Sequence, residues 1–270
     1  MDQQQKDILM KARSYRSVLA DGYRLYNENF RKLFKASWLM ALIFAIIAAA
    51  HVMLSFIQMP NLTALVIAIV VLILLCITTE ALAVGTIMNK LNEHQETNVI
   101  TTPASWWKPD SKMMGRTLKA AVFILPLCII LTPLFPLLLP INYVTMKYIL
   151  TPGQSFWPAL WSNYKRGLRY WGSMFLVFFV SILLVVLVSI IVILPAIILT
   201  MANMQAQQGL LMGDPLGMPN YILPLTFGTL VLTHFIEFYV VLVVLVHFYY
   251  IYGSIETKEM EREQQRQNIR

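Results

Sequence analysis

No charged residue interrupts the chain between Gly172 and Ala202, and this run constrains the fold more than any other feature of the sequence. A helix that crosses the hydrocarbon core of a bilayer needs about 20 apolar residues, more than a helix in a soluble core requires. Three further runs have a similar character, namely Ser37 to Gln58, Leu62 to Asn89 and Tyr221 to Tyr252. Because 58% of the residues are hydrophobic and 13% are charged, the sequence predicts an all-α, multi-pass integral membrane protein.

The region from Thr117 to Leu150 allows two interpretations. It is too long for one straight span and short for two. It contains four prolines, Pro126, Pro133, Pro136 and Pro140. Counted once, the region gives the chain five spans, whereas a hairpin that turns at "TPLFP" gives it six. The six predicted spans are about 37–58, 62–89, 115–132, 134–150, 172–202 and 221–252.

Charge placement distinguishes these two counts, because Lys and Arg gather in cytoplasmic loops. With six crossings all 21 Lys and Arg residues face the cytoplasm, whereas with five crossings thirteen face in and eight face out. We therefore predict a transmembrane helical bundle of six spans, with five spans plus a re-entrant hairpin as the alternative. In the fourth span, Lys147 would have to extend its amino group to the inner interface.

Amphipathic interfacial helices are predicted before spans 1 and 5. In the first of them, residues 5–29, apolar side chains recur on one helical face and most cations lie off that face. Large aromatic residues at the level of the lipid headgroups anchor segments of this kind. The predicted interfacial anchors are Tyr23, Phe30, Trp106, Trp107, Tyr164 and Trp171.

The two interfacial segments also resemble each other. Placing Tyr23 on Tyr164 aligns "GYRLYNENFRKLF" with "NYKRGLRYWGSMF" at an offset of 141 residues, and Phe30 then meets Trp171. An internal repeat would explain the match. The alternative is that any cytoplasmic loop of a membrane protein gathers Lys, Arg, Trp and Tyr.

A family resemblance is carried by "DGYRLYNENFRKLFKASWLMALIFAI", then a Pro-rich third span, then "YILTPGQSFWPALWSNYKRGLRYWGSMFLVFF". This series resembles a broad family of uncharacterised bacterial polytopic membrane proteins, similar to the membrane domain fused to some glycerophosphodiester phosphodiesterases, and the resemblance covers most of the chain. The residues that carry the resemblance are Ser155, Phe156, Ala159, Leu160, Ser162, Asn163, Tyr164 and Trp171. The resemblance implies a six-helix bundle in a bacterial inner membrane. It implies no activity, because no soluble segment here has room for the catalytic domain of those phosphodiesterases.

We expect residues 1–255 to form one membrane domain and residues 256–270 to form a polar cytoplasmic tail, either a solvated helix or disordered. The first thirty residues lack the apolar stretch of a cleaved signal peptide, so none is expected. The charge placement puts both termini in the cytoplasm, and the resemblance implies that the membrane is the bacterial cytoplasmic (inner) membrane. The topology accounts for the net charge of +7, so the expected partners are the lipid bilayer and its anionic cytoplasmic leaflet, not nucleic acid.

Four polar side chains inside the predicted spans form a candidate intramembrane site, namely Glu80, Glu237, His234 and His51. A charged carboxylate near the membrane centre costs roughly 2.5–3.5 kcal/mol on insertion scales, so each glutamate needs a partner, a proton or a water-filled cavity. Glu237 belongs to a polar stripe that we expect to point into the bundle. The stripe also contains Thr226, Thr229, Thr233 and His247, with His234 beside it. The four residues form either a proton relay, an ion site or a metal site, or a structural site in which hydrogen bonds to neighbouring helices hold protonated glutamates.

Motifs for the common soluble chemistries are missing from the sequence. There is no GxSxG, HExxH, GxxxxGK[ST] or Gly-rich dinucleotide motif. Cys76 and Cys128 lie in apolar runs without a metal-binding spacing, so neither a metal site nor a cofactor is predicted. His94, in the polar stretch "NEHQET", is expected to be a solvated surface residue.

Three functions are compatible with these features. The first is a non-enzymatic structural, accessory or interaction module, which would associate with a membrane-protein partner or with a second copy of itself. The second is a small transporter or ion- or proton-conducting protein that uses Glu80 and Glu237. The third is a membrane-embedded enzyme that acts on a lipid.

Overall fold

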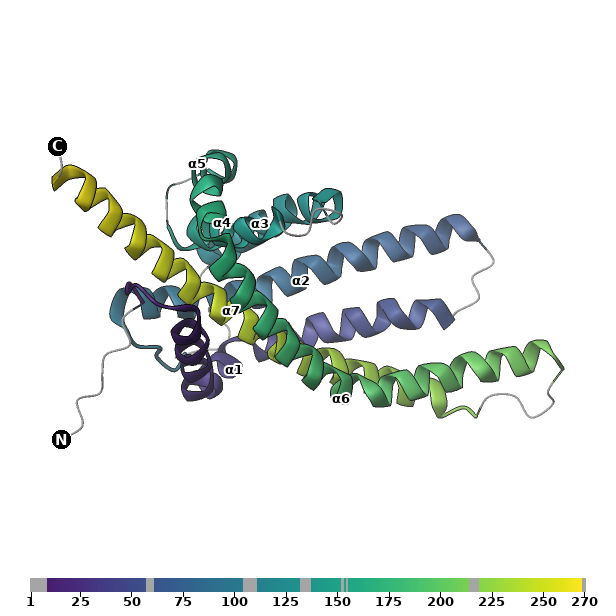
Figure 1. The fold of residues 1–270 in the computed structure, drawn as a ribbon. Coiled ribbons are helices and arrows are strands. Elements are labelled where there is room, and N and C mark those ends of the chain that lie inside the picture. The colour runs from purple at the N-terminus through teal and green to yellow at the C-terminus, as the bar shows by residue number, and fades with distance from the viewer. Residues whose placement is uncertain are drawn as a thin grey trace, which may run out of the picture. The chain divides into compact units, whose positions relative to one another are not determined.

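The structure is a computed structural model, which describes residues 9–56, 61–103, 111–131, 137–151, 153, 155–213 and 219–268. Within these residues the chain forms seven α-helices and one short 3-10 helix, and it forms no strand (Figure 1). The elements are α1 (Tyr15–Met53), η1 (Leu54–Phe56), α2 (Leu62–Thr97), α3 (Ser111–Leu131), α4 (Leu139–Leu150), α5 (Phe156–Arg169), α6 (Trp171–Leu211) and α7 (Ile222–Asn268). The predicted all-α class is confirmed.

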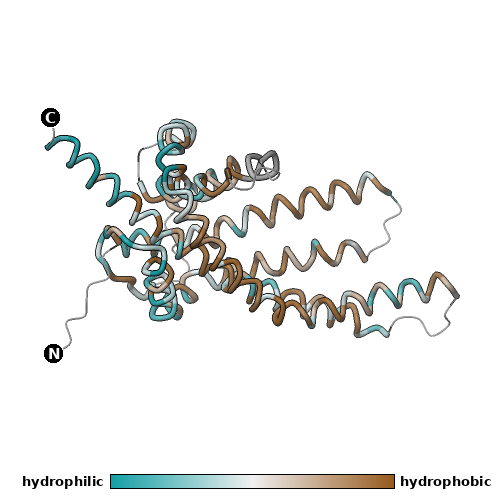
Figure 2. The backbone as a smooth tube through the Cα atoms, in the orientation of Figure 1, coloured by the Kyte–Doolittle hydropathy of each residue, from teal (hydrophilic) through white to brown (hydrophobic). Residues whose placement is uncertain are grey.

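Four of these helices are long and apolar enough to cross a membrane. They are α1, α2, α6 and α7, with 39, 36, 41 and 47 residues. Each exceeds the roughly 20 residues that a span requires, so polar turns continue beyond the apolar part. Figure 2 shows this most clearly at the hydrophilic C-terminal end of α7. These helices agree with the first, second, fifth and sixth predicted spans and indicate a membrane protein.

The region that was predicted to cross twice has a different form. Helix α4 has 12 residues and is about 18 Å long, whereas the hydrocarbon core is about 30 Å thick. Among the described residues, neither α3 nor α4 is a candidate span, and residues 132–136, where the hairpin was expected to turn, lie outside them. Four crossings, like six, place every Lys and Arg on one side, so the charge rule does not distinguish these even counts.

The chain divides into two compact units, and the four long helices contribute to both. The first unit contains Met1–Ser37, Val84–Leu183 and Leu242–Arg270. The second contains Trp38–Ala83 and Leu184–Val241. Each unit is described by itself below.

The core of the first unit is the part of α7 between Leu242 and Ile255, where most side chains are buried. Helix α1 approaches it through Gly22, because a Cβ added there would clash with the His247 ring. Helix α2 approaches it from another direction, since the Tyr249 hydroxyl donates to the Leu91 carbonyl at 2.9 Å. A helix that other elements cover on every side is buried all round, which explains the apolar and aromatic composition of this stretch.

The second unit is held by small residues and apolar contacts between its helices. Ala41, Ala45 and Ala49 of α1 are fully buried at a four-residue spacing. Ala49 lies in a core cluster with Ala196 of α6 and Leu230 of α7. Small side chains let helix backbones approach closely, which favours van der Waals contact where lipid removes the hydrophobic driving force.

The two segments of the predicted internal repeat begin their helices at corresponding positions. Helix α1 begins at Tyr15 and α5 begins at Phe156, which is an offset of 141 residues, and a serine precedes each start. The correspondence continues at the buried positions, because Leu33 and Met174 are both 0% exposed. The copies differ in one respect, since α1 is continuous whereas the second copy is interrupted at Tyr170, between α5 and α6.

Candidate functional site

Glu237 of α7 hydrogen-bonds to a neighbouring helix within the second unit. The Ser189 hydroxyl of α6 donates to one carboxylate oxygen of Glu237 at 2.7 Å. His234 lies one turn earlier on α7, and His51 is the polar residue of α1 in this unit. Glu80, the fourth predicted member, is exposed on α2, one turn from Cys76. The structure thus gives Glu237 a partner that the sequence did not predict.

Further polar pairs join α6 and α7 in the same way. In the second unit the Asn203 amide donates to the Thr226 hydroxyl, and in the first unit Ser181 and His247 are hydrogen-bonded at 2.7 Å. Thr226, Thr233 and His247 are buried, so the predicted inward orientation of the polar stripe is confirmed for these three residues. Because α6 and α7 run antiparallel, residues far apart in the sequence lie opposite each other, and their polar side chains can hydrogen-bond across the contact between the helices.

The α6 partners of these pairs were missed from the sequence. Ser181, Ser189 and Asn203 lie 33, 25 and 11 residues before position 214 in the loop between α6 and α7, and their partners on α7 lie 33, 23 and 12 residues after it. A search for polar residues placed symmetrically about this loop would therefore have found them. The spacing was overlooked because Ser and Asn are weak hydropathy signals inside an apolar run.

Four buried polar atoms of the second unit have no hydrogen-bond partner among the described residues. They are Oε1 of Glu237, Nε2 of His234, Nδ1 of His51 and Oδ1 of Asn203. Buried polar atoms are normally satisfied, so such atoms mark a place for a water molecule or a proton. The described residues contain no group of three His, Cys, Asp or Glu side chains that could hold a metal ion.

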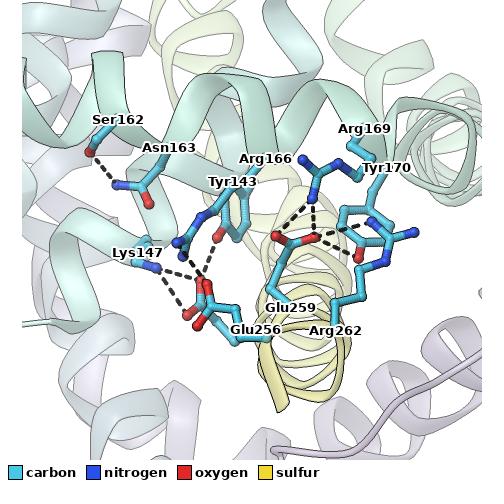
Figure 3. A network of polar contacts seen from close by, with 11 residues as sticks. Tyr143, Lys147, Ser162, Asn163, Arg166, Arg169, Tyr170, Glu256, Glu259 and Arg262 are labelled. Carbon is cyan, nitrogen blue, oxygen red and sulfur yellow. Dashed lines mark hydrogen bonds and ion pairs between the residues drawn. The ribbon is translucent and has the colours of Figure 1, made fainter. Parts of the chain in front are cut away.

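A second polar network surrounds the C-terminal turns of α7 in the first unit (Figure 3). The Lys147 amino group of α4 donates to both Glu256 oxygens, at 2.7 and 2.9 Å. The hydroxyl of Tyr143, one turn earlier on α4, also donates to Glu256. The side chains of Lys147 and Glu256 are 11% and 17% exposed, so α4 is fixed to α7 by a largely buried ion pair.

The next turn of α7 repeats this arrangement with the end of α5. The Arg169 guanidinium donates to the two Glu259 oxygens at 2.7 and 2.9 Å, and the Tyr170 hydroxyl donates to the same carboxylate at 2.8 Å (Figure 3). Arg262 contributes a second cation at 3.3 Å. Glu259 is 6% exposed, so its charge is balanced by neighbours in place of water.

These contacts lie outside the apolar part of the helices, and they shift the pKa values of both Tyr170 and Glu259. Burial, and then the hydrogen bond to Glu259, raise the pKa of the Tyr170 hydroxyl above its usual value. Burial alone would raise the pKa of Glu259, but the hydrogen bonds from Tyr170 and Arg169 and the two guanidinium charges outweigh it, and the pKa is lowered.

The lowered pKa of Glu259 predicts a loss of stability in acid. The folded pKa lies below the unfolded value of 4.5, so the carboxylate stabilises the fold above that pH, and the stabilisation is lost as pH falls through the folded pKa. We expect Glu259→Gln to lower the melting temperature by a constant amount between about pH 6 and 8, and by a shrinking amount below about pH 4.5. Melting curves in detergent measure this difference, and a difference that persists unchanged to about pH 3 contradicts the assignment.

Two residues and one segment lie in surroundings that the sequence did not predict. Lys147 is buried within the first unit, where it is paired with Glu256. Residues 256–268 continue α7, and they are solvated only beyond Glu259, so the tail is neither disordered nor uniformly exposed. His94 is 2% exposed within α2, where its Nδ1 lies 2.8 Å from the Tyr249 hydroxyl; its expected solvated position is wrong.

The predicted interfacial anchors lie in varied surroundings. Tyr23 and Phe30 are 46% and 38% exposed on α1. The half-buried Tyr164 donates its hydroxyl to the Leu137 carbonyl at 3.0 Å, and the half-buried Trp171 stacks on Phe175. The predicted anchors Trp106 and Trp107 lie outside the described residues.

Comparisons with protein-family models, with curated proteins and with solved structures found no match for this chain.

Proposed function

We propose that the protein is a structural or accessory module of the membrane, without an enzymatic site of its own. The observation that carries this proposal is that three of its glutamates bond to neighbouring helices. Glu256 and Glu259 hold α4 and α5 to α7, and Glu237 holds α7 to α6. An enzyme or carrier would need such groups to converge on a ligand, whereas here they are used between helices.

The module acts through association, either with a membrane-protein partner or with a second copy of itself. We place it in a bacterial cytoplasmic membrane with both termini in the cytoplasm, because an even number of crossings leaves all 21 cations on that side. The resemblance to the membrane domain fused to some glycerophosphodiester phosphodiesterases supports an accessory role, since that domain accompanies an activity and does not supply it.

A small transporter or proton-conducting protein is the second candidate. It is favoured by the unpartnered buried atoms of Glu237, His234 and His51, which are suited to exchange a proton or bind water. In the structural proposal Glu237 instead joins two helices, because the Ser189 hydroxyl already donates a hydrogen bond to its carboxyl group.

Flux through reconstituted vesicles separates these two candidates. We expect vesicles with the parent protein to pass protons and monovalent cations no faster than empty vesicles, and Glu237→Gln to change the melting temperature but not the flux. Glu80→Gln serves as a matched control, because Glu80 is an exposed intramembrane glutamate of the second unit. A parent flux that Glu237→Gln abolishes and Glu80→Gln retains would instead establish the transporter.

The topology that supports this proposal includes interfacial helices before the spans and a hairpin of α3 and α4. Six spans were predicted from the sequence, with a re-entrant hairpin as the alternative. We propose that the chain has four spans and that α3 and α4 form a re-entrant hairpin. Helix α4 is only about 18 Å long. At its C-terminal end, Arg116 of α3 donates hydrogen bonds to the Tyr148 and Thr151 carbonyls.

Cysteine labelling at position 135 tests the hairpin. In a Cys76→Ala, Cys128→Ala background, we expect Phe135→Cys to resist an impermeant maleimide applied from the extracytoplasmic side. Asn220→Cys, in the loop before α7, provides the positive control for that side. Labelling of both positions from outside would restore the six-span topology.

A further inference from the structure

Helix α5 presents three kinds of surface around its circumference. One side packs into the first unit, and its buried residues are Phe156, Ala159, Leu160, Asn163 and Gly167. A second side exposes Trp157, Trp161 and Leu168, which are 44%, 75% and 45% exposed. With about 100° of rotation per residue, these three side chains lie within about 40° of one another around the helix axis. The third side follows them and carries Lys165, Arg166 and Arg169.

The exposed aromatic side is unusual for a surface that faces water. Trp161 protrudes beside a second half-exposed tryptophan, and Trp157 is held in place by its edge contact with Phe123 of α3 at 5.5 Å. Tryptophan gathers where an apolar medium meets water, because its ring is amphipathic. The arrangement of a packed, an aromatic and a basic side is therefore that of a helix lying in a membrane interface.

The position of α5 in the chain places it at such an interface. Helix α6 begins at Trp171, two residues after α5 ends, and it is the most apolar of the four candidate spans. Because only Tyr170 separates the two helices, the end of α5 lies where α6 enters the bilayer. The cations on the third side of α5 then lie at the level of the lipid phosphates.

The charges of α5 favour an anionic partner. The helix has three cations and no carboxylate. Arg166 and Arg169 are paired with Glu263 and Glu259 of α7, but Lys165 is exposed and forms no ion pair with the described residues. Lys165 therefore remains available to a lipid phosphate beside the exposed tryptophans.

We propose that the outer side of α5 binds the anionic phospholipids of the leaflet in which α6 begins. Trp157, Trp161 and Leu168 lie among the upper acyl chains, and Lys165 contacts the headgroup phosphate. This surface extends the function proposed above, which concerns contacts between helices. It identifies a lipid class as a ligand of the chain.

The first test measures the depth of α5 with spin labels in phosphatidylglycerol nanodiscs. Labels are placed at Trp161→Cys or Ser162→Cys in the full chain with Cys76→Ala and Cys128→Ala, since both positions are exposed. We expect oxygen to collide more often than a water-soluble nickel complex with the label at position 161, and the reverse at position 162. If both labels are reached mainly by the nickel complex, α5 lies outside the bilayer and the proposal is overturned in favour of a protein partner for Trp161.

The second test measures lipid preference by the quenching of tryptophan fluorescence with brominated lipids in mixed micelles. The fluorescence of Trp161 is obtained as the difference in fluorescence between the parent and Trp161→Phe. We expect brominated phosphatidylglycerol to quench the Trp161 fluorescence at a lower mole fraction than brominated phosphatidylcholine does. Lys165→Gln should raise the mole fraction of phosphatidylglycerol that is needed about fivefold. Arg266→Gln, which removes an equal charge from the exposed end of α7, should leave it unchanged. Equal quenching by the two lipids overturns the proposal.

Discussion

Lys147→Met is expected to lower the free energy of unfolding by about 3 kcal/mol. The substitution leaves the Glu256 carboxylate largely buried without its cation, and among the described residues the Tyr143 hydroxyl is the hydrogen-bond donor that remains to it. An uncompensated buried charge costs more than the pair itself contributes to stability. Unfolding in detergent micelles, monitored by circular dichroism, measures the loss.

Two variants distinguish this effect from a general loss of charge. Lys165→Met removes a cation that is exposed and outside the ion pairs of the described residues, so its effect should stay within about 0.5 kcal/mol. The double variant Lys147→Met, Glu256→Met should recover most of the stability, because two apolar side chains can replace a buried pair. A single variant as stable as the parent would show that the pair is solvated and not structural.

Gly253→Ala is expected to displace the N-terminal segment 9–13 from α7 and to cost about 2 kcal/mol. A Cβ at this position would lie 2.6 Å from the Leu9 carbonyl oxygen and 2.6 Å from its Cδ1, so the backbone of the segment must move. The movement breaks the hydrogen bonds between Arg13 and Ser254. Arg13 is 5% exposed in the parent, so trypsin should cleave there at least about tenfold faster in the variant, as measured by the rate of appearance of the shortened chain.

Gly228→Ala is the matched control on the same helix. Apart from its chain neighbours and the surrounding backbone of α7, no atom of the described residues lies within 4 Å of a Cβ added at Gly228. Alanine favours a helix over glycine by up to about 1 kcal/mol. This variant should therefore match or exceed the parent in stability and leave cleavage at Arg13 unchanged. Equal effects at the two glycines would show that helix propensity, and not the contact with Leu9, governs position 253.

Much of the fold follows from runs of apolar residues that can be recognised in the sequence. The stretch from Gly172 to Ala202 lies within α6, and that from Tyr221 to Tyr252 lies almost entirely within α7. The inward orientation of the polar stripe on α7 also follows from helical periodicity, as Thr226 and His247 show. These inferences succeed because a bilayer requires each spanning segment to satisfy its own backbone, whatever its neighbours are.

The candidate site was predicted less completely. Glu237 was identified as a polar residue in need of a partner, but Ser189, which donates to it, was not. His94 was placed in water because its sequence neighbours are polar, whereas its face of α2 turns toward Tyr249. Trp157 and Trp161 were not selected as anchors, because exposure of a tryptophan depends on which side of α5 packs against the rest of the unit.

The sequence by itself determined that the chain is helical and suited to a membrane, since the hydrophobic length of a segment is a local property. The tertiary structure alone decided how the charged residues are used. Lys147 and Glu256 are 109 residues apart, and Arg169 and Glu259 are 90 residues apart, yet each pair is in direct contact. Charge counting assigned these residues to a cytoplasmic side and a solvated tail, because it considers each charge separately. The fold brings them together, and desolvation then makes each ion pair dependent on both of its members.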